Sequence, residues 1–441
     1  MSLETKLNVG DASICVIGLG YVGIPIAVEY ANKGFKVLGI DLNAQKVDKI
    51  NRGENYIDDI DDAIVERIVK DGLLSASTSF GKLEEQDVIY IAVPTPFKPN
   101  KEPDNSFIHA AAEEVAKYIR KDQLVLLKST TYPETTEKEV LPILEKSGLK
   151  VGKDFYLAFS PERVDPGNKK FTTENTPIVV GGVTPKCTEM AALALNKIVK
   201  YVHQVSNPRV AEMEKLLENI FRSVNIALVN ELARMCDRIG DIDVWEVIDA
   251  AATKPFGYMP FYPGPGIGGH CILVDPYFLA SKAREYDFHS NFIELAAQTN
   301  EDMPFYVAGM IRRAVSNTKT PFHDASILFL GAAFKNDIDD YRNSPALKVM
   351  GLIHQRGLKE IQYNDPYVPE VEVNGKLFKS IELTPKNIKK FDVVVIVTAH
   401  SIVDWQMVVD NAKYIVDTRN ATKGMKIDHT KVLKIGAGNR F

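Results

Sequence analysis

Residues 13–41, SICVIGLGYVGIPIAVEYANKGFKVLGID, decide the fold class of this chain. An apolar run over 13–17 predicts a buried strand, and the apolar positions over about 21–33 recur with the period of a helix. A second apolar strand follows and ends at Asp41. Strand, helix and strand in this order form one βαβ unit, which predicts an α/β fold with a parallel sheet.

The turn inside this unit contains Gly18, Gly20 and Gly23 in the spacing G-x-G-x-x-G, and Asp41 follows 18 residues after Gly23. Glycines here allow a tight turn and let a pyrophosphate approach the backbone at the helix N-terminus, while the acid can accept hydrogen bonds from a ribose diol. The pattern predicts dinucleotide binding, and a purely structural turn is the alternative. Because a carboxylate would repel a 2′-phosphate, Asp41 favours NAD over NADP.

The rest of the chain continues the alternation of strands and helices in two parts separated by a helical stretch. Further strands of the first part are expected at 88–94, 124–130, 156–162 and 176–182, with helices at 106–120 and 134–147. A helical period with almost no Gly or Pro runs from 208 to 240. It predicts either a core helix alone or one that also forms the interface of a homodimer or higher homo-oligomer. A second α/β pattern begins near Ser326. We therefore expect two Rossmann-like, doubly wound domains joined by a long central helix.

The composition is that of a folded globular protein. The 441 residues are 45% hydrophobic and 25% charged, and the net charge of -5 gives no electrostatic case for nucleic acid or an anionic membrane as a partner. No leader or membrane-spanning pattern occurs, so a cytoplasmic location is expected. The four cysteines are scattered without a CxxC pair, which predicts neither disulfides nor a metal site: Cys15, Cys187, Cys236 and Cys271.

A few polar residues are candidates for chemistry. Cys271 follows the glycine-rich run GPGIGGH on a loop that we expect to enter a helix at about 276–286, where backbone N–H groups stabilise a thiolate. An inert buried thiol is the alternative, and it fits Cys15 and Cys236. Lys215 and Asn219 share a face of the long helix at i and i+4. Glu162 and its neighbour Arg163 follow a strand, where such sheets bind ligands, or are simply solvated.

Taken together, these segments resemble the UDP-glucose/GDP-mannose dehydrogenase family over nearly the whole chain. The resemblance rests on GLGYVGIPIA, KSTTYPETT, SPERVDPGN, EKLLEN, GPGIGGHC, VDP and AFKNDIDDYRNSPAL in this order. It implies oxidation of a sugar C6 alcohol to a carboxylate with two NAD. It also implies three domains: an NAD-binding Rossmann-like domain at 1–205, a central helical dimerisation domain with the cysteine loop at 206–305, and a UDP-sugar-binding Rossmann-like domain at 306–441.

The resemblance also implies roles for individual residues. Cys271 matches the nucleophile that holds the C6 aldehyde as a thiohemiacetal and then a thioester, and Lys215 and Asn219 match the groups that stabilise the oxyanion. Glu162 matches the general base for thioester hydrolysis, Asp275 the acid beside the cysteine, and Thr130 a hydroxyl that positions water near the nicotinamide. The NAD contacts it implies are Gly18, Gly20, Tyr21, Val22, Gly23, Asp41, Thr95 and Thr130. The substrate contacts are Glu162, Arg163, Lys215, Asn219, Gly268, Lys335 and Arg342.

The substrate is expected to be a UDP-N-acetylhexosamine. PERVDPGN followed by TPIVVGG resembles the branch of the family that acts on UDP-N-acetyl-D-glucosamine, with UDP-N-acetyl-D-mannosamine and UDP-glucose as alternatives. The family's Asp-x-Arg-Ile-Gly segment is replaced by TKPFGYMPFYPGPG, where Lys254 is the candidate substitute for the arginine, and Leu273 stands where a proline is common. A non-catalytic NAD-binding regulatory protein is the alternative of a different class; the retained thiol argues against it.

Overall fold

The computed structural model describes residues 1–57, 60–96, 98, 101–163, 170–269 and 271–438, except for the side chains of Cys271 and His429. The chain divides into two compact units. The first comprises 1–218 and 277–288, and the second comprises 219–276 and 289–441. The three-domain division at 205/206 and 305/306 stays a prediction.

The described residues of the first unit form an eight-stranded sheet in the order β3-β2-β1-β4-β5-β6-β7-β8. All neighbours are parallel except β6 and β7. This confirms the predicted doubly wound architecture, with strands and helices at β1 Ile14–Ile17, α2 Gly23–Asn32, β2 Val37–Ile40, α3 Ala44–Asn51, α4 Asp62–Lys70, β3 Leu74–Ser77, β4 Val88–Ile91, α5 Ser106–Tyr118, β5 Leu124–Leu127, α6 Leu141–Leu144, β6 Tyr156–Phe159, β7 Ile178–Gly182, α7 Pro185–Leu195 and β8 Val202–Gln204.

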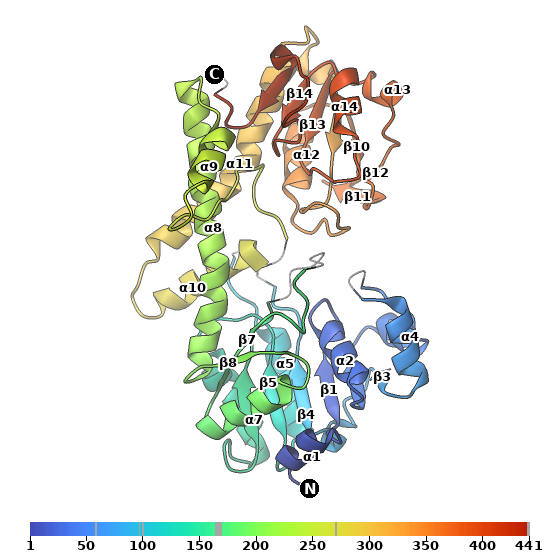
Figure 1. Cartoon of the computed structure of the whole chain (residues 1–441), viewed down its shortest axis with the longest axis vertical. Helices are drawn as coiled ribbons and strands as arrows, with labels where there is room; N and C mark the ends of the chain where they lie inside the picture. Colours follow the sequence, from blue (N-terminus) through green and yellow to red (C-terminus); the bar gives the residue numbers. More distant parts are fainter. Residues whose placement is uncertain (58–59, 97, 99–100, 164–169, 270, 439–441) are drawn as a thin grey trace. The chain divides into compact units, whose positions relative to one another are not determined.

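Both faces of this sheet are buried, because alternate side chains of each strand pack on opposite helical layers. Val16 and Tyr90 pack with α2, α4 and α7 on one face, and Ile17 and Ile91 pack with α5 and α6 on the other. An additional helix, α1 (Leu3–Val9), was not expected from the sequence. It lies beside the amino ends of β1 and β4 (Figure 1), where Lys6 pairs with the buried Asp87 at 2.8 Å.

The predicted long helix is α8 (Pro208–Ile239), 32 residues long. The helix after the cysteine loop, α10 (Cys271–Arg284), begins at Cys271, so the expected start near 276 is wrong. The sequence suggested a start at Pro276, which is instead inside the helix. Pro276 is the sixth residue of α10, so it removes the intrahelical hydrogen bond to the Ile272 carbonyl oxygen, and its ring crowds that carbonyl.

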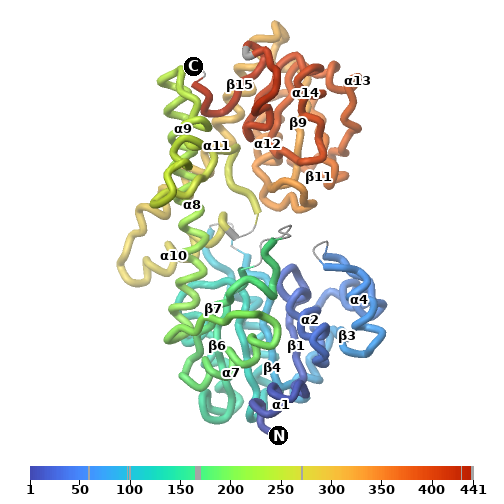
Figure 2. Tube along the Cα trace, in the orientation of Figure 1, coloured from blue at the N-terminus to red at the C-terminus, as the bar shows by residue number. Residues whose placement is uncertain are grey.

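The second unit contains the second α/β pattern. Its described residues form a five-stranded parallel sheet, β10-β9-β13-β14-β15, and a separate hairpin, β11-β12, that was not expected from the sequence. The Cα trace in Figure 2 shows α12 beside this sheet. The elements are α9 Val244–Ala252, α11 Asn291–Ser316, β9 Ser326–Leu330, α12 Pro345–Gln355, β10 Glu360–Asn364, β11 Glu370–Val373, β12 Lys376–Lys379, α13 Pro385–Ile388, β13 Val393–Ile396, α14 Trp405–Asn411, β14 Ile415–Asp417 and β15 Val432–Lys434.

This sheet is also covered on both faces. Phe329 and Val395 pack with α11 and α12 on one side, and Leu330 and Ile396 pack with α13 and α14 on the other. The second Rossmann-like domain is thereby confirmed. Within the residues described, no helix is long and apolar enough to span a lipid bilayer.

Candidate active site

The glycine turn after β1 has the geometry that a dinucleotide requires. A Cβ on Gly18, whose φ is 95°, would lie 2.4 Å from the Ala92 carbonyl oxygen, and one on Gly23 would lie 1.8 Å from that of Gly18. A Cβ on Gly20 would meet no atom within 4 Å, so the outer side of the turn is open. No side chain caps α2 and its first turn carries no acid. The helix N-terminus is thus arranged to receive an anionic diphosphate, and the residues present fit NAD.

Asp41 follows β2 directly and is tied to this turn. Its Oδ2 accepts a hydrogen bond from the Leu19 N–H at 2.9 Å, and its Oδ1 accepts one from the Asn43 N–H at 2.9 Å. Lys46 lies 3.6 Å from the same carboxylate. Asp41 is only half-buried, so lone pairs on both oxygens can still accept bonds from a ligand.

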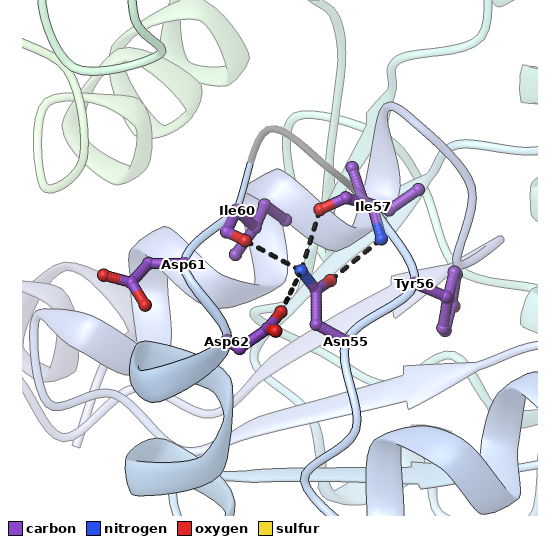
Figure 3. A pocket seen from close by; sticks show the side chains of 6 residues that line it. All are labelled: Asn55, Tyr56, Ile57, Ile60, Asp61 and Asp62. Atoms are coloured by element: carbon purple, nitrogen blue, oxygen red, sulfur yellow. Dashed lines mark hydrogen bonds between the residues drawn. The ribbon is translucent and has the colours of Figure 1, made fainter. Parts of the chain in front are cut away.

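A cavity of about 430 Å³ lies beside Tyr56, and its lining residues are Asn55, Tyr56, Ile57, Ile60, Asp61 and Asp62 (Figure 3). Asn55 organises this loop from within: its amide donates to the carbonyl oxygens of Ile57 and Ile60 at 2.8 and 2.7 Å. The hydroxyl of Tyr56 donates to the Leu19 carbonyl oxygen at 2.7 Å. The loop is therefore attached to the glycine turn by a direct hydrogen bond.

The candidates Thr95, Thr130 and Glu162 follow β4, β5 and β6, which are neighbours in the parallel part of the sheet. The carboxyl ends of parallel strands meet at one edge, so the structure brings these three residues to the same edge as Gly18 and Asp41. Thr95 is buried and Thr130 is half-buried. This edge is the ligand-binding edge of a doubly wound sheet.

Lys128 directly follows β5 and is almost fully buried beneath this edge. It was not singled out from the sequence. Its Nζ lies 3.3 Å from Glu162 Oε2 and donates to the Pro161 carbonyl oxygen at 3.1 Å. Burial lowers the pKa of Lys128; the negative charge of Glu162 raises it in part, and the positive charge of Lys215 lowers it. The structure thus brings Glu162 and Lys215 into one electrostatic cluster with a buried ammonium.

Arg163 faces α8. Its guanidinium pairs with Glu214 and with Glu218 at 2.9 Å, and it donates to the Pro177 carbonyl oxygen at 2.9 Å. Its backbone N–H donates to Glu162 Oε1 at 2.8 Å. Arg163 therefore contacts Glu162 directly through its main chain, while its charge is held by two carboxylates.

Lys215 and Asn219 are one turn apart on α8, and both are buried. Lys215 forms no salt bridge with the residues that the structure describes. The Asn219 amide donates to Asp275 Oδ2 at 2.5 Å, and Asp275 is itself buried. An amide nitrogen carries two N–H groups, and this hydrogen bond uses one of them.

Cys271 is the first residue of α10, and Asp275 lies one turn later on the same helix. The backbone of Cys271 is thus at a helix N-terminus, as expected, while its side chain lies outside the described part of the structure. A Cβ on Gly268 would lie 2.6 Å from Phe334 Cβ, and the Gly269 N–H donates to the Arg342 carbonyl oxygen at 3.1 Å. Glycine is therefore required where the cysteine loop packs on the 334–345 turn.

That turn carries Lys335 and Arg342, the remaining substrate candidates. The Arg342 guanidinium forms a two-pronged contact with Asp340, with Nε–Oδ1 2.9 Å and Nη2–Oδ2 2.6 Å, and its side chain is 52% exposed. Lys335 is half-buried on the same turn. Gly268, Lys335 and Arg342 are thus close together in the second unit.

Arg419, like Lys128, was not singled out from the sequence. It follows β14 at the carboxyl edge of the second sheet, its Nε donates to the Val397 carbonyl oxygen at 2.8 Å, and burial lowers its pKa to about 10. A Cβ on Gly264 would lie 2.9 Å from its Nη1, so the guanidinium lies against the cysteine loop. Lys128 and Arg419 each come at the carboxyl end of an apolar run, where such sheets bind ligands, but their neighbours in sequence do not show that they are buried.

The other thiols differ from a reactive cysteine. Cys15, Cys187 and Cys236 are buried, and burial raises the pKa of Cys15 and of Cys236. Thiols of this kind are inert. No cluster of three or more metal-ligating side chains occurs among the residues described.

The fold and the site define an NAD-binding oxidoreductase of the doubly wound type. Three domain descriptions of one family match the chain in order: the NAD binding domain at 12–199, the central domain at 209–302 and the UDP binding domain at 328–424. The chain belongs to the UDP-glucose/GDP-mannose dehydrogenase family and is an NAD-dependent UDP-sugar dehydrogenase.

Individual relatives are similar over most of their length. A UDP-N-acetyl-D-mannosamine dehydrogenase of Yersinia pestis is 37% identical over 414 residues, 91% of this chain and 94% of that protein. A UDP-N-acetyl-D-glucosamine 6-dehydrogenase of Pseudomonas aeruginosa is 34% identical over 395 residues, 89% and 91% of the two chains. The solved structure of a UDP-D-ManNAc dehydrogenase from Pyrococcus horikoshii superposes with a TM-score of 0.88 at 35% identity and covers 97% of this chain and 100% of that one.

Proposed function

We propose that the chain oxidises the C6 alcohol of UDP-N-acetyl-D-glucosamine to the uronic acid through a covalent adduct on Cys271. The observation that carries the proposal is the placement of the Cys271 backbone at the N-terminus of α10, four residues before a buried Asp275 that is hydrogen bonded to Asn219. Helix N–H groups favour a thiolate at that position. UDP-N-acetyl-D-mannosamine is the alternative substrate, favoured by the similarity to the Yersinia and Pyrococcus proteins.

NAD, when bound, supplies the hydride acceptor for both oxidations. The turn of Gly18, Gly20, Tyr21, Val22 and Gly23 holds its diphosphate, Asp41 its ribose hydroxyls, and Thr95 and Thr130 line the sheet edge next to the nicotinamide. Arg163, Gly268, Lys335 and Arg342 are assigned to the nucleotide sugar. Arg419 adds a buried positive charge at the carboxyl edge of the second sheet, which suits a phosphate.

In the first oxidation, Asp275 with a water molecule or Lys215 accepts the proton of the C6 hydroxyl as hydride leaves C6. The Cys271 thiolate then adds to the aldehyde carbon, and the oxyanion is stabilised by the ammonium of Lys215 and the second N–H of Asn219. Preorganised donors of this kind contribute about 3 kcal/mol each. Loss of a second hydride leaves a thioester.

Hydrolysis completes the cycle. Thr130 positions a water molecule, Glu162 takes its proton, the oxygen adds to the thioester carbon, and the C–S bond breaks to return the Cys271 thiolate. The pairing of Glu162 with Lys128 supports this role, because it holds the carboxylate in place at the sheet edge. Each turnover converts one alcohol and one water into one carboxylate while two hydrides are removed.

A homodimer is proposed from the exposed face of α8. Six large apolar side chains, each at least 43% exposed, fall within roughly 80° of one another at 100° per residue: Met213, Leu217, Phe221, Leu228, Met235 and Ile239. A second copy of this helix is the partner that matches such a stripe, since closed two-fold association is the commonest form of oligomer. We place the enzyme in the cytoplasm, where it supplies a uronic acid for polysaccharide synthesis.

The Cys271→Ala variant tests the chemistry. It should lose uronate formation completely while binding NAD with unchanged affinity, because the thiol is assigned to the adduct and to no NAD contact. Product analysis by mass spectrometry and calorimetric titration with NAD measure the two quantities. Normal four-electron turnover in Cys271→Ala would exclude the covalent route, and loss of NAD binding would point to a structural role for the residue.

A further inference from the structure

Two buried asparagines connect α8, α11 and the cysteine loop. Asn230 on α8 is fully buried, and its Oδ1 accepts a hydrogen bond from the Gly264 N–H at 2.9 Å. Its Nδ2 donates to Oδ1 of Asn300 on α11, also at 2.9 Å. The amide of Asn300 in turn donates to the Ser223 carbonyl oxygen at 3.0 Å. These hydrogen bonds form one continuous chain from the cysteine loop to the middle of α8. We call this chain of hydrogen bonds the relay.

The direction of this chain is determined at both ends by the main chain. The Gly264 N–H can only donate and the Ser223 carbonyl can only accept. An amide side chain has one accepting and one donating side, so only one orientation of both asparagines satisfies every group. Reversing either amide would leave buried polar groups unpaired, and that is strongly unfavourable.

The cysteine loop is held at two points, and Asn230 provides the first. The second is at Gly269, whose N–H donates to the Arg342 carbonyl oxygen and whose own carbonyl oxygen accepts from the Asn343 amide at 3.2 Å. Between these points, Gly266 has a φ of 130° and its Cβ position is 3.4 Å from the Asn300 carbonyl oxygen. Asn300 therefore lies against the loop as well as at the centre of the relay.

We propose that Asn230 and Asn300 are positioning residues that set the register of the cysteine loop, and thereby the place from which Cys271 enters α10. This inference rests on the proposed covalent function of Cys271. A buried pair of amides is a poor source of stability compared with apolar packing, but it specifies one arrangement of the groups that it joins. The relay acts on catalysis only through the loop and touches no NAD contact.

The isosteric variant Asn230→Asp tests the relay. Its carboxylate can accept from the Gly264 N–H but cannot donate to Asn300, so residue 230 is no longer fixed to α11 and the chain of hydrogen bonds is broken. We expect kcat to fall roughly 10- to 100-fold, since a displacement of about 1 Å at a reacting group has an effect of that size. The KM for NAD should not change. The matched control is Asn225→Asp on the same helix, where the residue is half-buried and its amide donates to the Phe221 carbonyl oxygen of the preceding turn at 2.7 Å.

Acid pH gives a second readout. A protonated aspartic acid has one donor and one acceptor, like asparagine, and burial favours the protonated form. The kcat of Asn230→Asp relative to wild type should therefore rise as the pH is lowered, and that of Asn225→Asp should not. The relay would be overturned if Asn230→Asp and Asn225→Asp had the same kcat at every pH while Cys271→Ala was inactive. Activity that survives Cys271→Ala would instead overturn the proposed function.

Hydrogen exchange in the unaltered enzyme provides a test that does not depend on whether Asn230→Asp folds. The relay predicts that the Gly264 amide exchanges more slowly than the Gly266 amide, which has no such buried acceptor among the residues that the structure describes. Equal, fast exchange at both positions would contradict it.

Discussion

The Asp41→Ala variant isolates the contribution of the acid after β2 to NAD binding. In the structure each carboxylate oxygen accepts one backbone N–H, from Leu19 in the glycine turn and from Asn43. The substitution removes these two bonds and also the acceptors assigned to the ribose diol. It therefore has a structural effect, present without ligand, and a separate effect on NAD affinity.

The effect on affinity can be calculated from hydrogen bonding. Two hydroxyl groups that donate to one carboxylate contribute about 3 kcal/mol together, which corresponds to a Kd for NAD that is roughly 100-fold weaker in the variant. At an NAD concentration about 100 times the wild-type Kd, the wild type gains about 2.7 kcal/mol of stability from the ligand and the variant only about 0.4 kcal/mol. Loss of the negative charge should also reduce the preference for NAD over NADP.

The assay compares unfolding with and without NAD for each protein, so that the structural effect cancels. Asp48→Ala, an exposed acid on α3, is the matched control and should retain the wild-type gain. Calorimetric titration then gives the two Kd values directly. A Kd for NAD in Asp41→Ala within about threefold of wild type would refute the assignment of Asp41 to the ribose.

Three further predictions concern other parts of the chain. Lys128→Met should lower the free energy of unfolding by about 3 kcal/mol and slow uronate release, because one partner of a buried ion pair is removed. The control Lys121→Met breaks a pair of the same 3.3 Å length, but its lysine is 75% exposed. In denaturant titration the control should change the free energy of unfolding by less than about 1 kcal/mol. Equal effects of the two substitutions would contradict the buried-pair account. Burial raises the pKa of Glu212 to about 7, although it accepts hydrogen bonds from the backbone of Glu134 and Thr136. The folded state therefore holds a proton that the unfolded state releases. The resulting stabilisation is complete below about pH 4.5 and decreases by about 3 kcal/mol as the pH rises through 7. Glu212→Gln should flatten this part of the pH profile of unfolding, and an unchanged slope would contradict the raised pKa of Glu212. Leu217→Glu with Leu228→Glu should convert a dimer into a monomer in analytical ultracentrifugation, whereas a dimer that persists would show that the α8 stripe is not the interface.

The sequence allowed accurate prediction of the strands that bury both faces, because each is a short apolar run between glycines or polar residues. β1 at 14–17, β4 at 88–91 and β5 at 124–127 all lie within the predicted segments. The hairpin at 370–379 was not predicted, since its alternating polar residues resemble a solvated loop. The start of α10 was placed five residues late, because Pro276 is a helix-start signal that here lies inside the first turns.

The candidate site was predictable where a motif supplies its own geometry, as in the glycine turn and Asp41. The ion-pair and hydrogen-bond partners of buried polar residues could not be predicted, because they depend on contacts between segments far apart in the chain. Lys128 pairs with Glu162 across two strands, and Asn230 reaches Gly264 from another element. A buried lysine and a buried asparagine cannot be distinguished from solvated ones by their neighbours in sequence.

Four-electron oxidation of a UDP-N-acetylhexosamine through a thioester is tested by the number of NADH formed per sugar. Limiting amounts of UDP-N-acetyl-D-glucosamine, UDP-N-acetyl-D-mannosamine and UDP-glucose are each incubated with enzyme and excess NAD until the absorbance at the NADH band is constant. We expect two NADH per UDP-N-acetyl-D-glucosamine, with the other sugars slower. Two NADH per UDP-N-acetyl-D-mannosamine, with that sugar fastest, would keep the mechanism and change the substrate. One NADH from the fastest sugar would contradict the thioester route, and none from any of them would indicate an NAD-binding protein without this activity.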